Sequence, residues 1–191
     1  MKKLVLSVSV LASLGLLALT QQSCSVKDLA KELFNAFVTD PQTASFTIPI
    51  VTSTAAPFGA LDSVILDANI NQIIQDKTGG QFSLDDADGI FLESLRFELD
   101  NADADNNWQN FEQVGIELVP NNANVSNLSM GPWNVDNTYS TSLSLDNIDK
   151  SINIKSYLTG TGAVYYILKG KARKETSHAL TGTMYITFKV E

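Results

Sequence analysis

The stretch IFLESLRFEL, residues 90–99, shows the clearest alternation of apolar and polar residues in the chain. Successive side chains of a β-strand point to opposite faces, so a period of two predicts a strand with one buried face. The apolar face holds four residues: Phe91, Leu95, Phe97 and Leu99. Arg96 and Glu98 take the other face. Glu93 falls among the apolar positions and is expected at a frayed strand start.

The same period recurs along the chain. Six further segments have the pattern of strands: 45–51, 63–70, 114–119, 138–145, 163–172 and 182–190. Pro49 cannot donate a ladder hydrogen bond, which predicts that the first of them lies at a sheet edge. The last two are expected to pair as a terminal hairpin around the loop RKETSHALT, residues 173–181.

Helical patterns are short. In NQIIQDKTGG, residues 71–80, a helical turn is expected to end at Gly79 and Gly80. Ser83 and Asp86 have the spacing of a capping box, and residues 151–158 fit either a strand or a helical turn. Strands joined by polar loops and short turns predict an all-β fold, an antiparallel β-sandwich of immunoglobulin-like or jelly-roll-like type over 45–191.

One helix is predicted ahead of this domain. Residues 28–38, DLAKELFNAFV, place their apolar side chains at helical spacing. Asp28 can cap the start of the helix, and Pro41 stops it soon after its end. We interpret residues 24–44 as a spacer whose helix packs on the domain or docks a partner near the membrane.

The first residues have the layout of a secretory leader. Lys2 and Lys3 give a positive start, and residues 4–19 form an apolar run. The run is shorter than the roughly 20 residues of a transmembrane helix. It is followed by Ser23 and Cys24, and Cys24 is the only cysteine, so a disulfide within the chain is excluded.

This segment resembles the leader of Gram-negative bacterial lipoproteins, which signal peptidase II cuts before a cysteine. The resemblance implies a signal peptide over 1–23 and a mature chain that begins at Cys24, bearing a diacylglyceryl thioether and an N-acyl chain such as palmitate. Several acyl chains give stable membrane anchoring. The residue after the cysteine is Ser25 rather than aspartate, which resembles the pattern of lipoproteins sent to the outer membrane. There the domain would face the periplasm or the cell surface. The domain resembles small envelope β-sandwich lipoproteins only in architecture.

The charge pattern argues against nucleic acid as a partner. The formal net charge is -8, whereas binding of phosphates needs lysine and arginine. The chain is acidic over 61–120 and more basic over 150–191. We interpret the basic residues as outward-pointing side chains that keep the strands soluble, with a basic binding face as the alternative.

The sequence offers little catalytic chemistry. His178 is the only histidine, it lies in a polar loop, and no G-x-S-x-G turn accompanies it. One cysteine and one histidine cannot build a zinc site of the Cys/His type. A carboxylate pair for glycoside hydrolysis stays open, although nothing singles out two acids. We therefore expect a protein that is not an enzyme.

The loop NADADNNWQNFE, residues 101–112, carries the best local pattern for a ligand. Oxygen-bearing side chains occupy positions 1, 3, 5, 7 and 12 of a possible calcium loop: Asn101, Asp103, Asp105, Asn107 and Glu112. The spacing predicts Ca²⁺ as a possible cofactor. The alternative is an acidic, soluble hairpin loop.

Two tryptophans complete the candidate sites. Trp108 lies in the same loop and Trp133 in the segment MGPWNVD, which is also expected to be a loop. Exposed rings beside Asn and Asp suit carbohydrate binding, and the alternative is that both rings cover the core. The leading hypothesis is a lipid-anchored, non-enzymatic envelope protein for adhesion, scaffolding or partner binding. The second is a carbohydrate-binding lipoprotein that uses these tryptophans.

Overall fold

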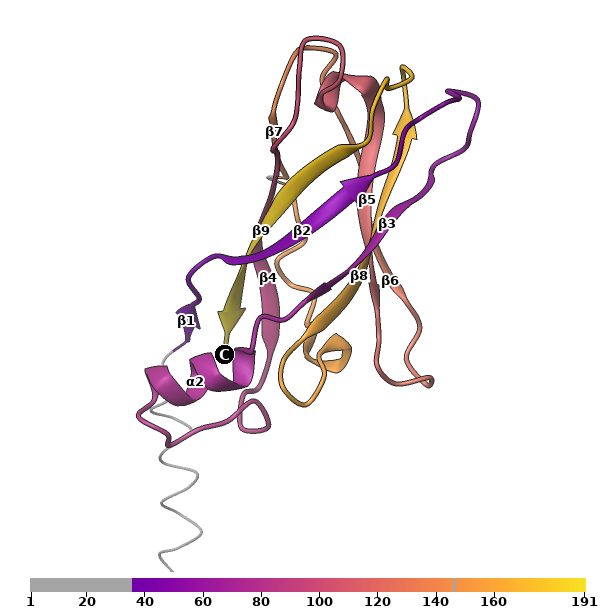
Figure 1. The fold of residues 1–191 in the computed structure, drawn as a ribbon. Coiled ribbons are helices and arrows are strands. Elements are labelled where there is room, and N and C mark those ends of the chain that lie inside the picture. The colour runs from indigo at the N-terminus through magenta and orange to yellow at the C-terminus, as the bar shows by residue number, and fades with distance from the viewer. Residues whose placement is uncertain (1–35, 146) are drawn as a thin grey trace, which may run out of the picture. The chain divides into compact units, whose positions relative to one another are not determined.

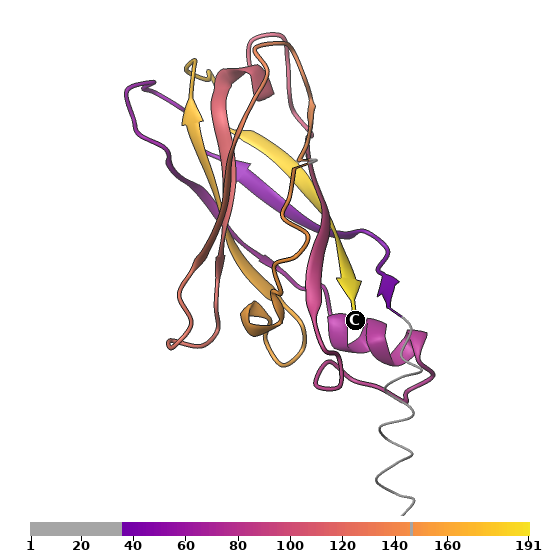
Figure 2. The ribbon, with the colours of Figure 1, turned by 180° about the vertical axis from the view of Figure 1, so that it is seen from behind.

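The computed structural model describes residues 36–145 and 147–191. Residues 37–191 form one compact unit in which two antiparallel sheets pack together (Figures 1 and 2), which confirms the predicted all-β sandwich. Sheet A consists of β1 (Phe37–Val38), β2 (Gln42–Ile48), β9 (Leu180–Val190), β4 (Ile90–Leu99) and β7 (Ser142–Ser144). Sheet B consists of β3 (Gly59–Leu66), β8 (Val164–Ala172), β5 (Phe111–Val119) and β6 (Leu128–Asn134). The helical elements are α2 (Ile70–Lys77), η1 (Trp108–Asn110) and η2 (Lys155–Tyr157).

Strand β4 lies between β9 and β7 in sheet A and contains a β-bulge. Leu92 pairs with Phe188 of β9 and Ser94 pairs with Thr187, so Glu93 is an extra residue without a partner on β9. The bulge shifts the alternation, and Leu92 is buried while Glu93 is only partly buried. The prediction that Glu93 lies in a frayed strand start was wrong, because the bulge accommodates Glu93 inside the strand while the residues on both sides of it keep their pairing with β9.

The centre of the core is a cluster of aromatic rings contributed by both sheets. Trp108 has no exposed surface, and its ring centroid lies 5.9 Å from Phe97, 6.2 Å from Phe46 and 5.8 Å from Phe111. Phe46 meets Phe97 edge to face at 5.7 Å. Such geometries add to the stabilisation from burial. The cluster therefore joins β2 and β4 of sheet A to β5 of sheet B.

The two C-terminal strands do not form the predicted hairpin. Strand β8 pairs with β3 and β5, whereas β9 pairs with β1, β2 and β4 of the other sheet. The link between them crosses the sandwich, and the backbone N–H groups of Arg173 and Lys174 donate to the Asn110 carbonyl. Alternation along a strand fixes which side chains are buried but not which strand is the neighbour, so the pairing was predicted wrongly.

The N-terminal boundary also differs from the prediction. Strand β1 pairs Phe37 with Val190, and β2 begins at Gln42, so the sandwich starts before residue 45. The end of the predicted helix 28–38 is therefore strand, and its residues 28–35 lie outside the described residues, as does the leader with Cys24. In the parts of the chain that the structure describes, no helix is both long and apolar enough to cross a membrane.

Three other segments depart from the expected bounds. Strand β3 ends at Leu66 because Asn69 adopts a left-handed conformation (φ 43°) and starts α2 at Ile70. Strand β7 keeps only the end of the predicted strand 138–145. Strand β6 was not predicted, since Gly131 and Pro132 interrupt its alternation.

Candidate functional site

The 101–112 loop is held by its own side chains. The Asp103 carboxylate accepts the backbone N–H groups of Asp105 (2.9 Å) and Asn106 (2.8 Å) and the Asn106 side-chain amide (2.8 Å). These hydrogen bonds, led by that of the Asn106 side chain, lower the pKa of Asp103 below its usual value. Asn107 and Asn110 form a reciprocal capping box around η1. Hydrogen bonds within the loop thus fix its conformation at one end of the sandwich.

The predicted calcium ligands are engaged in other contacts. Asn107 is fully buried, and its side-chain oxygen accepts the backbone N–H of Gln109. The Asn101 oxygen accepts the N–H of Thr181, and the Glu112 carboxylate pairs with Lys171 at 2.7 Å. Among the described residues, no group of three or more His, Cys, Asp or Glu side chains is placed to hold a metal ion. Calcium binding at Asn101, Asp103, Asp105, Asn107 and Glu112 stays a prediction that these contacts do not favour.

Trp108 lies in the 101–112 loop as expected, whereas Trp133 lies on a strand. Trp108 is completely buried in the aromatic core, which matches the alternative that its ring covers the core and excludes its use for stacking on a sugar. Trp133 is half-buried on strand β6 opposite Val114, not in a loop, and its ring lies against the backbone of Gly131. Asn106, Asn107 and Asn110, which suggested an exposed sugar-binding loop, are buried beside Trp108 and hydrogen-bonded.

His178 contacts residues of its own loop and of the 101–112 loop. Its Nδ1 lies 3.5 Å from the Ser177 hydroxyl and 3.9 Å from the Asp103 carboxylate. Its Nε2 lies 3.3 Å from the Asn101 carbonyl. In a hydrolase relay the serine and the carboxylate approach opposite ring nitrogens. Here both approach the same nitrogen, so these side chains do not form that relay.

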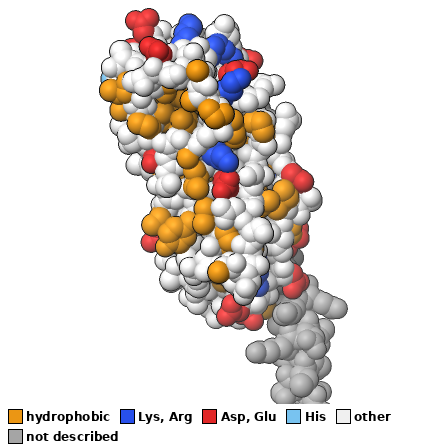
Figure 3. Space-filling view, turned by 90° about the vertical axis from the view of Figure 1, so that its right-hand side faces the viewer, with side chains coloured by type: hydrophobic (Ala, Val, Ile, Leu, Met, Phe, Trp, Pro, Cys, Tyr) orange, Lys and Arg blue, Asp and Glu red, His pale blue; other side chains and the backbone are white. Residues whose placement is uncertain are grey.

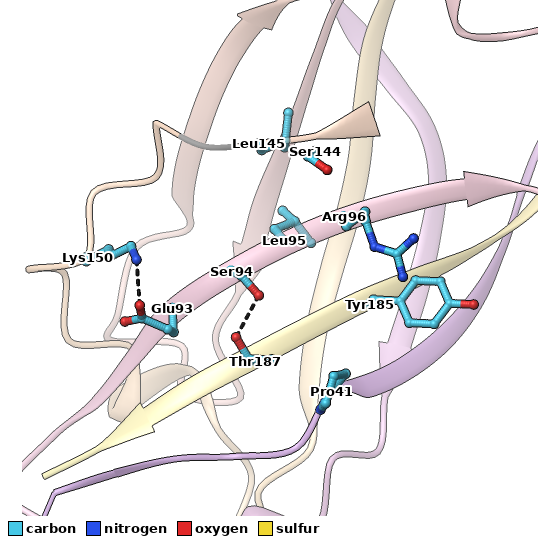
Figure 4. Close-up of a pocket in the computed structure, with 10 residues that line it drawn as sticks. All are labelled: Pro41, Glu93, Ser94, Leu95, Arg96, Ser144, Leu145, Lys150, Tyr185 and Thr187. Atoms are coloured by element: carbon cyan, nitrogen blue, oxygen red, sulfur yellow. Dashed lines mark hydrogen bonds and ion pairs between the residues drawn. The ribbon is translucent and has the colours of Figure 1, made fainter. Parts of the chain in front are cut away.

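A polar groove lies on the outer face of sheet A (Figure 4). It has a volume of about 280 Å³, and five separate segments line it. Its residues are Pro41, Glu93, Ser94, Leu95, Arg96, Ser144, Leu145, Lys150, Tyr185 and Thr187. No single segment of the sequence points to this groove, because β4 and β9 bring together residues that are about ninety positions apart.

Three side-chain pairs organise the groove. The guanidinium of Arg96 lies 4.2 Å above the centre of the Tyr185 ring and also pairs with Glu98. Figure 4 shows two further pairs: Lys150 Nζ lies 2.5 Å from the Glu93 carboxylate, and the hydroxyls of Ser94 and Thr187 are 2.6 Å apart. Stacking and ion pairing limit the rotamers of these side chains, so the groove is preorganised.

The outer face of sheet B differs in character. Ile65, Val119, Tyr165 and Ile167, from β3, β5 and β8, line a shallow hollow of about 360 Å³, which we call the apolar strip. Ile65 is 55% exposed and Tyr165 is 39% exposed. Figure 3 shows this side of the molecule, where hydrophobic side chains gather in patches with a basic and an acidic side chain between them.

One ion pair lies beside the strip on β5 and β8. Lys169 donates to the Glu117 carboxylate at 2.8 Å, and Asn127 and Ser129 donate to the same carboxylate. These contacts, led by the bond from Lys169, lower the pKa of Glu117. The Lys169 ammonium also lies 5.7 Å above the Phe58 ring. The ion pair therefore finds its partners within the fold, whereas Ile65 and Tyr165 of the neighbouring strip are exposed.

Comparison with known proteins does not assign this chain to a family. No protein-family model matches the sequence, and no curated protein matches it.

Proposed function

We propose that this chain is a lipid-anchored, non-enzymatic protein of the bacterial outer membrane whose sandwich binds a protein partner in adhesion or scaffolding. The observation that carries partner binding is the apolar strip on sheet B. Anchoring rests on the leader, in which Lys2, Lys3 and the apolar run precede Ser23 and Cys24.

The strip supports a protein partner because of what it exposes. Large hydrophobic side chains that stay in contact with water, as Ile65 and Tyr165 do, gain about 25 cal/mol for each Å² of apolar surface that a partner covers. Tyrosine is also enriched among the residues that dominate binding energy at interfaces. Carbohydrate binding through the loop tryptophans is not part of the proposal, because Trp108 has no accessible surface.

Site-directed photo-crosslinking in native membranes tests partner binding. A photo-reactive residue replaces Ile65 in one variant and Thr183, on the outer face of sheet A, in a control variant. We expect a discrete protein adduct from position 65 and none from position 183. Equal labelling at both positions, or labelling at neither, would show that the strip is not the binding surface.

The anchor has a separate test. The intact mass of the membrane-extracted protein should correspond to residues 24–191 plus acyl groups on Cys24, and Cys24→Ser should release the protein from the membrane. A mass that still includes residues 1–23, without added acyl groups, would refute the lipid anchor.

A further inference from the structure

We propose that the groove on the outer face of sheet A binds a neutral saccharide unit, with Glu93, Arg96 and Tyr185 as its main contacts. This site is on a different sheet from the strip, and the inference does not depend on the proposed protein partner. It rests on the β-bulge at Glu93, on the balanced charges of the groove and on its stacked arginine and tyrosine.

The bulge is the first argument. Leu92 and Ser94 pair with consecutive residues of β9, so a strand without Glu93 would continue its ladder with the same side chains facing the core. The inserted residue is therefore not needed to bury Leu92 or Leu95. What it does is place a carboxylate in the groove, beside Lys150. Bulges often aim a side chain at a functional site in this way.

Charge and hydrogen-bonding capacity are the second argument. Arg96 and Lys150 are balanced by Glu98 and Glu93, so neither an anion nor a cation is favoured by net charge. The groove offers acceptors, donors and the hydroxyls of Ser94, Ser144 and Thr187, which can act as both. A sugar hydroxyl also donates and accepts, so a neutral polyhydroxylated ligand matches this mixture.

The stack of Arg96 on Tyr185 is the third argument. A guanidinium carries five N–H donors, and within the described residues the guanidinium of Arg96 donates a hydrogen bond to Glu98 alone. Its stacked position leaves a planar donor group held in place for two neighbouring ligand hydroxyls. Pro41 and the part of the Tyr185 ring that Arg96 does not cover supply apolar surface for the C–H face of a sugar ring. At about 280 Å³ the groove suits roughly one sugar ring rather than a larger ligand.

The test is binding of the full chain, extracted in mild detergent, to an array of neutral and acidic glycans, followed by calorimetric titration with the best neutral glycan. Three variants change the groove: deletion of Glu93, Glu93→Gln and Tyr185→Ala. Thr183→Ala is the matched control, because Thr183 lies on the same strand, β9, and does not line the groove. Circular dichroism and melting temperature report whether each variant is folded.

We expect neutral glycans to bind, with affinity at least tenfold weaker in each groove variant and unchanged in Thr183→Ala. If the deletion does not fold, the two substitutions decide the result. The proposal is overturned if no neutral glycan binds, if only acidic glycans bind, or if folded groove variants retain the affinity of the control.

Discussion

On the outer face of sheet A, strands β4 and β9 present ion pairs, hydroxyls and a stacked tyrosine, whereas β3 and β8 on sheet B present isoleucine and tyrosine to water. Both faces come from the same alternation, and the same aromatic cluster lies between them. The two faces differ in their outward-pointing side chains, which do not determine the fold. One sandwich can therefore offer a polar groove for a small ligand and an apolar surface for a macromolecule.

The largest expected effect comes from a change in the aromatic core that both sheets share. We expect Trp108→Ala to lower the free energy of unfolding by about 3–5 kcal/mol, because it empties a fully buried site that contacts both sheets. Urea denaturation measures the loss, and Trp108→Phe should lose less. A loss below about 1 kcal/mol would mean that the cluster does not join the sheets as described.

A smaller effect is expected where β9 passes β4 closely. A Cβ at Gly182 would lie 2.3 Å from the Glu98 carbonyl oxygen and 2.4 Å from the Phe46 ring. We expect Gly182→Ala to cost about 1–3 kcal/mol through overpacking, measured by thermal unfolding. Gly160→Ala is the control, because nothing lies within 4 Å of that position, and it should change stability by less than about 0.5 kcal/mol. Similar stabilities for the two variants would contradict the tight packing at sheet A.

A substitution in the apolar strip should remove partner binding, leave glycan binding intact and change stability little. We expect Ile65→Ser to alter the free energy of unfolding by less than about 0.5 kcal/mol, since the side chain is mostly exposed. The same variant should abolish crosslinking to the protein partner from a photo-reactive residue at position 165, while glycan binding to the groove stays unchanged. Loss of both activities would show that the faces are not independent.

The smallest effect concerns the ion pair beside the strip. The folded-state pKa of Glu117 lies below its ordinary value of 4.5, so the ionised carboxylate stabilises the fold above that pH. As the pH falls through the lowered pKa, the carboxylate is protonated and this contribution is lost. We expect Glu117→Gln to be less stable than the native protein by under about 1 kcal/mol at pH 7, and the difference to vanish near pH 2. Melting temperatures across this range measure it, and a difference that persists in acid would exclude the ion pair as its cause.

What the sequence predicts correctly is local. Alternation identified β4 and β5, and Gly79 and Gly80 with positive φ follow α2 as expected. What it missed depends on contacts between distant residues. Contacts with strands far away in the chain decide three features: which strands pair with β8 and with β9, the bulge at Glu93 and the burial of Trp108.

The candidate sites show the same limit more strongly. The asparagines and aspartates of 101–112 have calcium-like spacing, yet the same side chains can satisfy buried backbone groups, and the sequence does not distinguish the two uses. No motif in the sequence marks the groove, because its residues come from five segments. Only the awkward position of Glu93 in the strand pattern pointed towards it.

The central place of β9 in sheet A has a consequence for biosynthesis. This strand follows every other described strand of the sandwich in the sequence, and within the described residues β1, β2 and β4 have no partner in sheet A other than β9 and the short β7. Folding therefore waits for a late, long-range pairing. Until β9 is made, the pairing of β4 with the short β7 is the one pairing of sheet A among the described strands. The late closure of sheet A is compatible with the proposed lipid anchor, which requires that the chain is exported before it folds.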